Sequence, residues 1–475
     1  MCGLAGMMGG YTREGLEKAK DELQHRGPDD SGIFEDPAHR VGLVHTRLSI
    51  LDLSPAGHQP MVSADGKVGL VFNGELYNYL ELKKELTRDQ GEWAVGGGQL
   101  AKAGSSWIGT SDTEVLLRLY LETRRKGGSF PDLLPRLNGM FALAIWDGRD
   151  ETLWLARDAF GIKPLYLHQG TDRFSFASEI KALLPLVKDP GELDRVALGR
   201  YLSFLWCPGE RTPFTHIKKA DPGSFFCVRG GKLVKQGRWF VPSPRPEGRS
   251  LAEKELAREV AARLRTSVHQ QMVSDVPVGA FLSGGLDSSA VVAFAREINP
   301  EIRCFTIQAA DWKEEEVTDD LPYALEAARS LKVPIEVVPM ASGQMAGEIE
   351  NMITMLEEPL ADPAALNILK MSQLARLGGV KVLLSGAGGD DLFAGYRRHQ
   401  AIAWHRWWDR IPRGLREGLR AGVRSLSPRN ETVRRAKKAL EALEAEPRAR
   451  IAAYFLWTDQ TTRGGLWADG GKWPD

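Results

Sequence analysis

The chain has 475 residues, with 62 Lys and Arg side chains against 62 Asp and Glu, so its formal net charge is zero. This length predicts two or three domains, because a single hydrophobic core rarely grows beyond about 250–300 residues. Apolar residues make up 43% and charged residues 26%, which excludes a disordered, collagen-like or coiled-coil chain. The balanced charge gives no reason to expect nucleic-acid or membrane-surface binding.

The cysteines and the apolar segments bear on the compartment. The four cysteines form no CxxC pair and are too few for a disulfide framework, which favours a reducing compartment. No basic segment followed by an apolar one suggests a signal peptide, and the longest apolar runs fall far short of the roughly 18–20 residues of a membrane span. We therefore expect a cytoplasmic protein with no membrane span.

Residues 1–205 are predicted to form a strand-rich first domain. Short β-rich runs, separated by Asn-Gly and Asp-Gly turn signals, occur at Val41–Leu53, Lys67–Phe72, Met140–Trp146, Thr152–Arg157 and Phe174–Ser178. Leucines with helical spacing predict a helix over Glu114–Thr123. The Gly-rich segment Gly91–Ser106 is predicted to be a surface loop. Many strands with few helices favour packed antiparallel sheets.

Residues 206–250, which include the proline-rich stretch Pro242–Gly248, are predicted to be a linker, and residues 251–475 a second domain. Helices are expected at Glu253–Met272, Ser288–Ile298, Leu321–Ser330, Met345–Leu356 and Asn367–Leu377. Strands are expected at Val278–Leu282, Arg303–Gln308, Ile335–Val338 and Val380–Leu384. This alternation predicts a parallel sheet that binds ligands at the carboxyl ends of its strands.

Two glycine-rich loops follow strands of this sheet. The loop SGGLDSS (Ser283–Ser289) lies between an apolar strand and a helix, so its backbone N–H groups and hydroxyls suit a phosphate. Asp287 would repel phosphate unless Mg²⁺ lies between them. The second loop, SGAGGDDLFAGY (Ser385–Tyr396), also carries carboxylates. Either loop alone could be an ordinary turn, but together they indicate a Mg²⁺-pyrophosphate site, and no Walker A sequence occurs.

Cys2 follows only the initiator methionine. Removal of Met1 would give Cys2 a free α-amine, whose ordinary pKa of about 7.7–8.0 suits a general base beside the thiol. A cysteine at this position is more often chance, so its partners matter. Asn73 and Gly74 in NGELYN could form an oxyanion hole, or an Asn-Gly hairpin turn. Arg47 could bind a carboxylate and Asp112 an ammonium group, or each could be an ordinary surface charge.

These motifs resemble the glutamine-hydrolysing asparagine synthetase family. MCGLAG, HRGPDDSG, RLSILDL, NGELYN, TSDTE, GMFALAIWD and RDAFGIKPLY resemble its N-terminal glutaminase domain, and SGGLDSS, DDLPYA and SGAGGDDLFAGY resemble its synthetase domain. The matches run in the family's order from residue 1 to about residue 400. The resemblance implies an α+β fold, an αββα sandwich of the N-terminal-nucleophile hydrolase type, followed by an α/β parallel-sheet ATP-pyrophosphatase domain.

The resemblance also assigns roles. Cys2 would attack the carboxamide of glutamine while Asn73 and Gly74 hold the oxyanion, and ammonia would pass through an internal tunnel to the second domain. The other glutamine-binding positions would be Arg47, Leu48, Ser49, Ile50, Leu51, Glu75 and Asp112. ATP would contact Leu282, Ser283, Gly284, Gly285, Asp287, Ser288, Ser289, Ile307, Ser385 and Gly386, and Mg²⁺ would lie on Asp287 and Asp390. An acceptor carboxylate, aspartate by default, would be adenylated and then amidated, and a homodimer is compatible with the family.

Two departures from the family pattern keep alternatives open. Ala387 stands where these synthetases carry a glutamate beside the acceptor, and neither an RVPFLD-like segment nor a later lysine is seen before Asp475. We therefore expect either a truncated chain or an incomplete synthetase site. A sugar or peptide carboxylate as acceptor remains an alternative, as does a glutaminase or regulatory protein with a vestigial ATP site.

Charge is unevenly distributed along the second domain. Residues 401–438 carry a net charge of +8 and three tryptophans, whereas residues 311–326 carry −6. The basic segment could form solvated helical faces, or a surface for an anionic acceptor such as a sugar nucleotide or an acidic polysaccharide.

Overall fold

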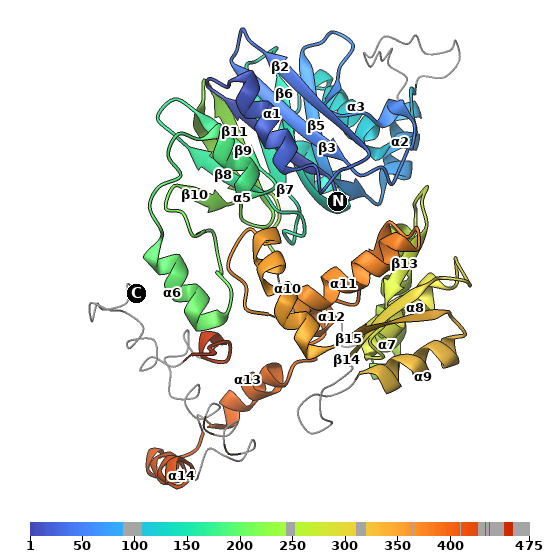
Figure 1. Cartoon of the computed structure of the whole chain (residues 1–475), viewed down its shortest axis with the longest axis vertical. Helices are drawn as coiled ribbons and strands as arrows, with labels where there is room; N and C mark the ends of the chain where they lie inside the picture. Colours follow the sequence, from blue (N-terminus) through green and yellow to red (C-terminus); the bar gives the residue numbers. More distant parts are fainter. Residues whose placement is uncertain are drawn as a thin grey trace.

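The computed structural model describes residues 1–88, 107–243, 252–309, 320–362, 364–408, 410–425, 433, 437 and 451–458. Two bodies, one β-rich and one built on a smaller sheet, lie one above the other in Figure 1. The predicted loop Gly91–Ser106 lies outside the described residues, as do most of the acidic stretch 311–326 and part of the basic segment 401–438.

The first domain consists of two six-stranded antiparallel sheets, ordered β10-β8-β9-β1-β3-β2 and β12-β11-β7-β6-β5-β4. The strands are β1 Gly3–Met8, β2 Asp30–Asp36, β3 Val41–Arg47, β4 Met61–Val62, β5 Val68–Leu76, β6 Gly139–Asp147, β7 Thr152–Arg157, β8 Tyr166–Gln169, β9 Phe174–Ala177, β10 Ile217–Lys219, β11 Ser224–Arg229 and β12 Lys232–Arg238. The predicted linker 206–250 therefore contains three strands of these sheets. The expectation of a linker is wrong for this part of the chain, because Ile217, Phe225 and Phe226 are buried in the sheets.

Helices cover the outer faces of both sheets. On one side lie α1 Arg13–Glu22 and α5 Ile180–Leu183, and on the other α2 Tyr79–Arg88, α3 Asp112–Arg125 and α4 Phe130–Leu133. Alternate residues of the strands point inward, so Leu4 and Val71 belong to a core between the sheets while their neighbours pack under the helices. The predicted αββα sandwich is confirmed. A further helix, α6 Arg195–Phe204, follows the sandwich layers in sequence.

The second domain is built on a parallel sheet in the order β15-β14-β13-β16. Its strands are β13 Val278–Phe281, β14 Cys304–Ala309, β15 Ile335–Met340 and β16 Val382–Leu384. Its helices are α7 Glu253–Gln271, α8 Leu286–Ala295, α9 Leu321–Leu331, α10 Ser342–Met355, α11 Ala364–Leu377, α12 Gly389–Leu392, α13 Arg397–Trp408 and α14 Arg413–Ser425. The predicted alternation of strands and helices is confirmed, with element ends shifted by a few residues.

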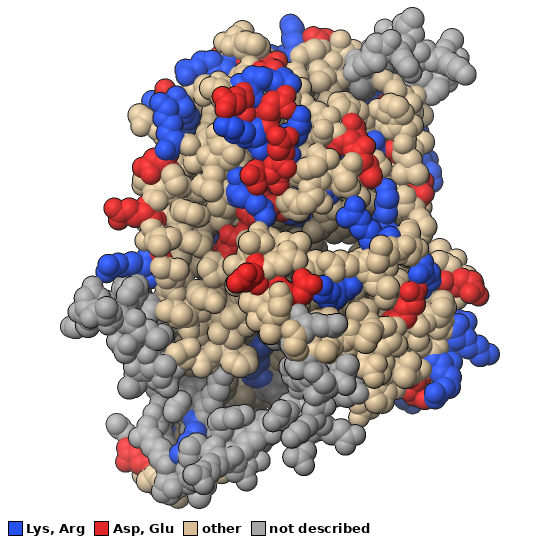
Figure 2. All heavy atoms as spheres, viewed as in Figure 1, with Lys and Arg blue, Asp and Glu red and all other residues tan. Residues whose placement is uncertain are grey.

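The hydrophobic cores respect the division into two domains. In the parts of the chain that are described, three clusters of buried apolar side chains lie within residues 4–239, and two lie within residues 264–384. None of these five clusters draws residues from both domains. Basic and acidic side chains are interspersed over the face of the first domain seen in Figure 2. No helix in the described ranges is both long enough and apolar enough to cross a membrane.

Candidate functional site

Cys2 lies directly before β1, the strand that pairs with β3 on one side and β9 on the other. Its Sγ accepts the backbone N–H of Leu48 at 3.4 Å. The next residue, Gly3, packs closely on β3, because a Cβ there would come within 2.8 Å of Oγ1 of Thr46. Burial raises the pKa of the Cys2 thiol, and the hydrogen bond from Leu48 opposes this shift. The thiol is therefore a neutral group that needs a base before it can attack.

Asn73 and Gly74 approach from the other sheet, where both are paired residues of β5, opposite Ala142 and Phe141 of β6. The alternative of an Asn-Gly hairpin turn is therefore wrong. A Cβ on Gly74 would lie 2.3 Å from the carbonyl oxygen of Met140, so only glycine fits. The Asn73 side chain is buried, its Oδ1 has no hydrogen-bond partner, and its Nδ2 reaches Oγ of Ser178 only at 3.5 Å. A weakly held, buried amide is available for an oxyanion.

The segment 48–54 connects β3 to a short 3₁₀ turn, Pro55–Gly57. We call it the glutamine loop because it contains Leu48–Leu51, which are predicted to bind glutamine. Arg47 is only 6% exposed, so it is not an ordinary surface charge. Its guanidinium donates to the carbonyl oxygens of Leu51 at 3.1 Å and Ser54 at 3.2 Å, and also to that of Asp52. Arg47 therefore shapes the loop that the sequence predicted to bind glutamine.

One pocket brings most of the predicted glutamine site together. Its lining includes Cys2, Arg47, Leu48, Ile50, Leu51, Gly74, Glu75 and Asp112. Ser49 and Asn73 of the predicted set are not among the lining residues. The side chains that the prediction omitted are Gln59, Phe72, Ser111 and Thr113. Gln59 brackets the backbone of Phe72, accepting its N–H at 2.7 Å and donating to its carbonyl at 3.2 Å, which fixes the strand that leads to Asn73.

Two carboxylates in this pocket have raised pKa values. Burial raises the pKa of Asp112 from an ordinary 3.8 to about 6, although its Oδ2 accepts the backbone N–H of Leu76 at 2.9 Å. Burial, with the nearby charge of Asp112, raises the pKa of Glu75 well above its usual range. Two carboxylates with raised pKa values in one pocket favour a cationic group beside them, such as the ammonium of an amino acid.

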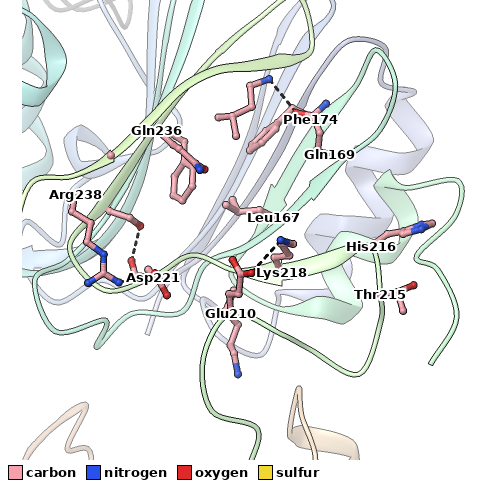
Figure 3. Close-up of a pocket in the computed structure, with 15 residues that line it drawn as sticks. Leu167, Gln169, Phe174, Glu210, Thr215, His216, Lys218, Asp221, Gln236 and Arg238 are labelled. Carbon is pink, nitrogen blue, oxygen red and sulfur yellow. Dashed lines mark hydrogen bonds and ion pairs between the residues drawn. The ribbon is translucent and has the colours of Figure 1, made fainter. Parts of the chain in front are cut away.

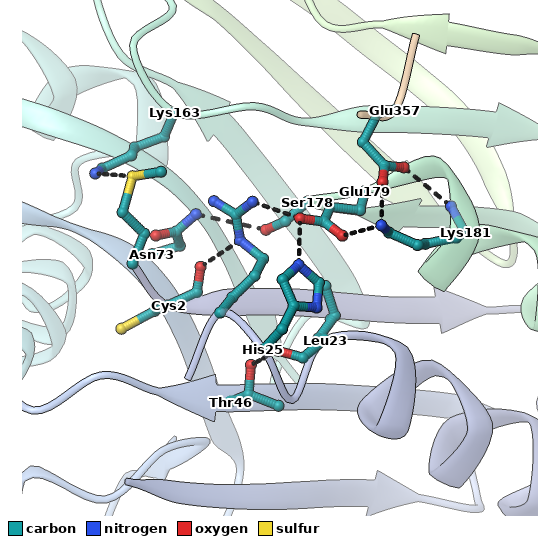
Figure 4. A network of polar contacts seen from close by, with 12 residues as sticks. Cys2, Leu23, His25, Thr46, Asn73, Lys163, Ser178, Glu179, Lys181 and Glu357 are labelled. Atoms are coloured by element: carbon teal, nitrogen blue, oxygen red, sulfur yellow. Dashed lines mark hydrogen bonds and ion pairs between the residues drawn. The ribbon is translucent and has the colours of Figure 1, made fainter. Parts of the chain in front are cut away.

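A polar network behind Cys2 was not assigned from the sequence (Figure 4). Arg26 donates from Nε to the carbonyl oxygen of Cys2 at 3.0 Å and from Nη1 to Glu179 at 2.6 Å. Lys163 is buried, so its pKa is lowered. Both Arg26 and Lys163 lie in motifs quoted above, HRGPDDSG and RDAFGIKPLY, but a single basic residue in a motif gives no sign that it faces the nucleophile.

The segment Ser283–Ser289 follows β13 and continues into the first turn of α8, so it connects a strand to a helix as predicted. Gly284 has a positive φ of +80° and passes so close to Tyr323 that a Cβ would lie 2.3 Å from its backbone carbon. Oγ of Ser283 and Oγ of Ser288 are 3.1 Å apart, and Ser288 donates to the carbonyl of Gly285 at 3.2 Å. Hydrogen bonds of its own serines therefore fix the loop. Gly284 and Gly285 carry no side chains that would keep a phosphate from their backbone N–H groups.

The second loop packs directly on the first. A Cβ on Gly386 would lie 2.6 Å from the backbone nitrogen of Ser288, and one on Gly389 would lie 2.2 Å from a carboxylate oxygen of Asp287. Burial and the neighbouring charge of Asp390 raise the pKa of Asp287. The two carboxylates are close enough for the charge of Asp390 to act on Asp287, and a divalent cation such as the predicted Mg²⁺ prefers ligands of this kind. Within the described ranges, no group of three or more His, Cys, Asp or Glu side chains is placed to hold a metal.

Leu282 and Ile307 occupy different positions beside the cradle. The side chain of Leu282 is buried in the domain core, so only its backbone can face a ligand. Ile307 lies in β14, opposite Val338 of β15.

A larger pocket, of about 720 Å³, lies away from both sites, where the β10 edge of one sheet faces the β12 edge of the other (Figure 3). Four of its charged side chains form two pairs, Lys218 with Glu210 at 3.2 Å and Arg238 with Asp221 at 2.6 Å. No predicted site residue lines it.

The chain matches two family models in succession. Residues 1–240 match a glutamine amidotransferase domain and residues 259–470 an asparagine synthase domain. The chain is 35% identical to a glutamine-hydrolysing asparagine synthetase of Bacillus subtilis, over 88% of this chain and 62% of that protein. It is 33% identical to a putative glutamine-hydrolysing asparagine synthetase of Methanocaldococcus jannaschii, over 84% of this chain and 76% of that protein.

A third relative has a different name. The amidase chry2 of Gibberella zeae is 30% identical over 82% of this chain and 56% of its own length. The chain thus spans about three fifths of the length of several curated relatives that it matches. With its two domains in this order and these identities, the chain belongs to the glutamine-hydrolysing asparagine synthetase family.

Proposed function

We propose that this chain hydrolyses glutamine at Cys2 and uses the released ammonia to amidate a carboxylate that ATP activates in the second domain. The observation that carries the proposal is the single pocket lined by Cys2, Gly74, Glu75, Asp112 and the glutamine loop. It combines a nucleophile, an oxyanion donor and two carboxylates for an ammonium group. Those are the parts that acyl transfer from an amino acid amide needs.

The first half-reaction follows from the groups around Cys2. After removal of Met1, the α-amine of Cys2 takes the thiol proton, and Sγ attacks the carboxamide carbon of glutamine. Asn73 Nδ2 and the Gly74 N–H would stabilise the tetrahedral oxyanion. The intermediate collapses with the proton delivered to the departing nitrogen, so ammonia leaves and a thioester remains. Water then hydrolyses the thioester to glutamate and regenerates the thiol.

Recognition of glutamine would rest on charge. Asp112, with Glu75 beside it, would bind the ammonium group once ionised. The glutamine loop, whose carbonyl oxygens Arg47 holds in place, would frame the α-carboxylate end of the substrate.

The second half-reaction would use the two glycine-rich loops. Ser283, Gly284, Gly285, Ser288, Ser289, Ser385 and Gly386 would cradle ATP, with Leu282 and Ile307 near the adenosine. Asp287 and Asp390 would hold Mg²⁺, which would supply positive charge beside the pyrophosphate. The acceptor carboxylate attacks the α-phosphorus and releases pyrophosphate, and ammonia then displaces AMP from the acyl adenylate. Aspartate is the acceptor we propose first, on the names of the relatives.

A sugar or peptide carboxylate is the second candidate acceptor. Ala387 is exposed in the second loop, where the family resemblance implies a glutamate, and two relatives named amidases are 30% and 31% identical to this chain. We also propose a cytoplasmic location, since all four cysteines are free thiols, and a homodimer by family resemblance.

Pyrophosphate release across a panel of acceptors tests the function. With ammonium as nitrogen donor, aspartate-dependent release supports asparagine synthesis, and release with only a sugar or peptide acid supports the second candidate. No release with any acid, together with active glutamine hydrolysis, would contradict synthesis and favour a vestigial ATP site. Cys2→Ala should abolish glutamine-dependent release and spare ammonium-dependent release, and intact mass should show loss of Met1.

A further inference from the structure

One residue of the second domain binds the glutamine loop at two points. Asp275 lies in the turn between α7 and β13, and its backbone N–H donates to the carbonyl of Ile50 at 3.0 Å. Its carboxylate Oδ2 accepts the backbone N–H of Asp52 at 2.8 Å. Asp275 therefore brackets the stretch Ile50–Asp52, which also contributes Ile50 and Leu51 to the lining of the Cys2 pocket.

Asp52 adopts a conformation that needs such support. Its φ is +57°, in the left-handed region that side chains other than glycine disfavour. Its carboxylate is occupied within the first domain, accepting the N–H of Thr110 at 2.7 Å and that of Ser54 at 3.1 Å. Asp52 is only 5% exposed, and loss of the Asp275 carboxylate would remove the acceptor of its backbone N–H. The shape of the glutamine loop thus depends on the second domain.

Lys381 supplies a second, weaker anchor. Its Nζ lies 2.8 Å from Oδ2 of Asp29, the same oxygen that accepts the N–H of Ser49 at 2.8 Å. Ser49 follows Leu48, which donates to the Cys2 thiol. The side chains of Lys381 and Asp29 are 37% and 29% exposed, so solvent weakens this pair.

The two anchors lie at the amino ends of two neighbouring strands of the parallel sheet. β13 begins three residues after Asp275 and β16 directly after Lys381, and the strands pair with Val278 opposite Val382. Ser283 and Ser385 follow the other ends of these strands. At about 3.3 Å per residue, Lys381 and Ser385 are on the order of 13 Å apart. A pair of hydrogen-bonded strands therefore connects the glutamine loop to both nucleotide loops.

We propose that Asp275 is a positioning residue for glutamine hydrolysis, supplied to the Cys2 pocket by the second domain, with Lys381 as an auxiliary anchor. This inference rests on the proposed function, because it concerns the same pocket. Asp275 acts on the loop that frames glutamine and leaves the thiol itself untouched. Its loss should therefore weaken the binding and orientation of glutamine while the inherent reactivity of Cys2 is kept.

Four variants of the full chain test this role. Asp275→Ala should raise the KM for glutamine in hydrolysis by about tenfold, since the N–H of Asp52 loses its charged acceptor. Asp275→Asn keeps an oxygen acceptor in place and should recover most of the loss. Lys381→Met should change KM by no more than about threefold. The matched control is Gln270→Ala at the end of α7, which loses a hydrogen bond to Asn138 of the first domain at 3.3 Å.

Ammonium-dependent pyrophosphate release should be unchanged in all four variants, which shows that the second domain is intact. Equal KM values for Asp275→Ala and Gln270→Ala would overturn the proposal, as would a failure of Asp275→Asn to recover activity.

A labelling experiment separates this inference from the proposed function. Cys2 should react with iodoacetamide at the same rate in wild type and Asp275→Ala, but the variant should react about tenfold more slowly with a glutamine analogue that carries a diazoketone. Equal slowing by both reagents would mean a general structural defect and overturn the positioning role. A wild type that binds the analogue at Cys2 yet releases no pyrophosphate would contradict the proposed synthesis and leave the role of Asp275 intact.

Discussion

Arg26 connects the nucleophile to a buried carboxylate: its Nε donates to the carbonyl oxygen of Cys2 at 3.0 Å, and its Nη1 lies 2.6 Å from Oε1 of Glu179 (Figure 4). The two side chains are 10% and 4% exposed, so the pair is shielded from solvent. Burial acts to raise the pKa of Glu179, but the hydrogen bonds from His25 and Arg26 outweigh it and hold the pKa at about 2. The backbone of Cys2 is thus fixed by a charged pair rather than by the sheet alone.

Replacement of Arg26 should damage both stability and catalysis. Arg26→Met leaves Glu179 as a buried charge with fewer partners, which costs about 3–5 kcal/mol when one member of a buried pair is removed. Denaturant unfolding of the first domain should show this loss, and glutamine hydrolysis should fall with it. Glu179→Gln keeps the shape of the pair and should be milder. Equal unfolding midpoints for Arg26→Met and wild type would contradict this account.

Acid should weaken the first domain through the same pair. The pKa of Glu179 is lowered from an ordinary 4.5 to about 2, so its stabilising contribution is present above pH 4.5 and is lost as pH falls toward 2. We expect the free energy of unfolding to decrease over this range, with a shallower decrease in Glu179→Gln. Chemical denaturation at a series of pH values measures both slopes, and parallel slopes would exclude Glu179 as the cause.

Glutamine use should depend on the ionisation of Asp112. Its pKa of about 6 means that the carboxylate is charged at pH 7.5 and largely neutral at pH 5. A neutral carboxyl cannot pair with an ammonium group, so kcat/KM for glutamine should fall by a further factor of about ten per pH unit below pH 6, in addition to the fall caused by protonation of the Cys2 α-amine. Asp112→Asn should be weakly active and lose the additional fall below pH 6, keeping only the acid limb that protonation of the Cys2 α-amine imposes. The same additional fall in that variant would assign the titration to another group.

Asn73 should act on the chemical step more than on binding. Asn73→Ala removes a buried amide whose Nδ2 is held only by a 3.5 Å contact to Ser178. Loss of one oxyanion donor lowers kcat by roughly 100-fold or more, and KM should change far less. Steady-state kinetics of glutamate release measure the split. Ser178→Ala is the matched control, since it removes the contact but keeps the amide, and a similar loss in both variants would contradict the assigned role.

Asp390 should matter for ATP chemistry alone. Asp390→Asn removes a charge that, with burial, raises the pKa of Asp287, so the fold should tolerate the change. Pyrophosphate release should drop by roughly 100-fold or require much more Mg²⁺, because the metal loses a charged ligand. Glutamine hydrolysis should stay within about twofold of wild type. Asp391→Asn, next in the chain, serves as the control, and equal effects of the two variants would contradict a specific metal ligand at Asp390.

Local patterns predicted the second domain well, because its strands are apolar runs followed by glycine-rich loops and its helices have clear lengths. The first domain was harder. Asn73 and Gly74 have the sequence of a tight turn but lie inside β5, where nine consecutive residues pair with β6. The pairing of two sheets overrides a local turn preference. The region after residue 205 carries turn residues, yet Phe225 and Phe226 are buried in the sheets, which only the tertiary fold could show.

Most residues that line the candidate site were predicted from the sequence, but the residues that hold them in place were not. Cys2, Arg47, Gly74 and Asp112 were found because reacting and binding groups have characteristic chemistry. Arg26, Glu179 and Asp275 act through contacts between segments that are far apart in the chain. No spacing in the sequence indicates that a turn near residue 275 lies on a loop near residue 50, since that proximity arises only when the two domains assemble.

The division of the hydrophobic cores makes the chain modular. Since none of the described clusters joins the two domains, residues 1–240 contain every apolar contact that their own sandwich needs and are expected to fold when expressed alone. Such a fragment would retain Cys2 and its oxyanion donors but lack Asp275 and Lys381. A folded yet inefficient glutaminase is the expected product, so an isolated first domain would waste little glutamine on ammonia that has no acceptor.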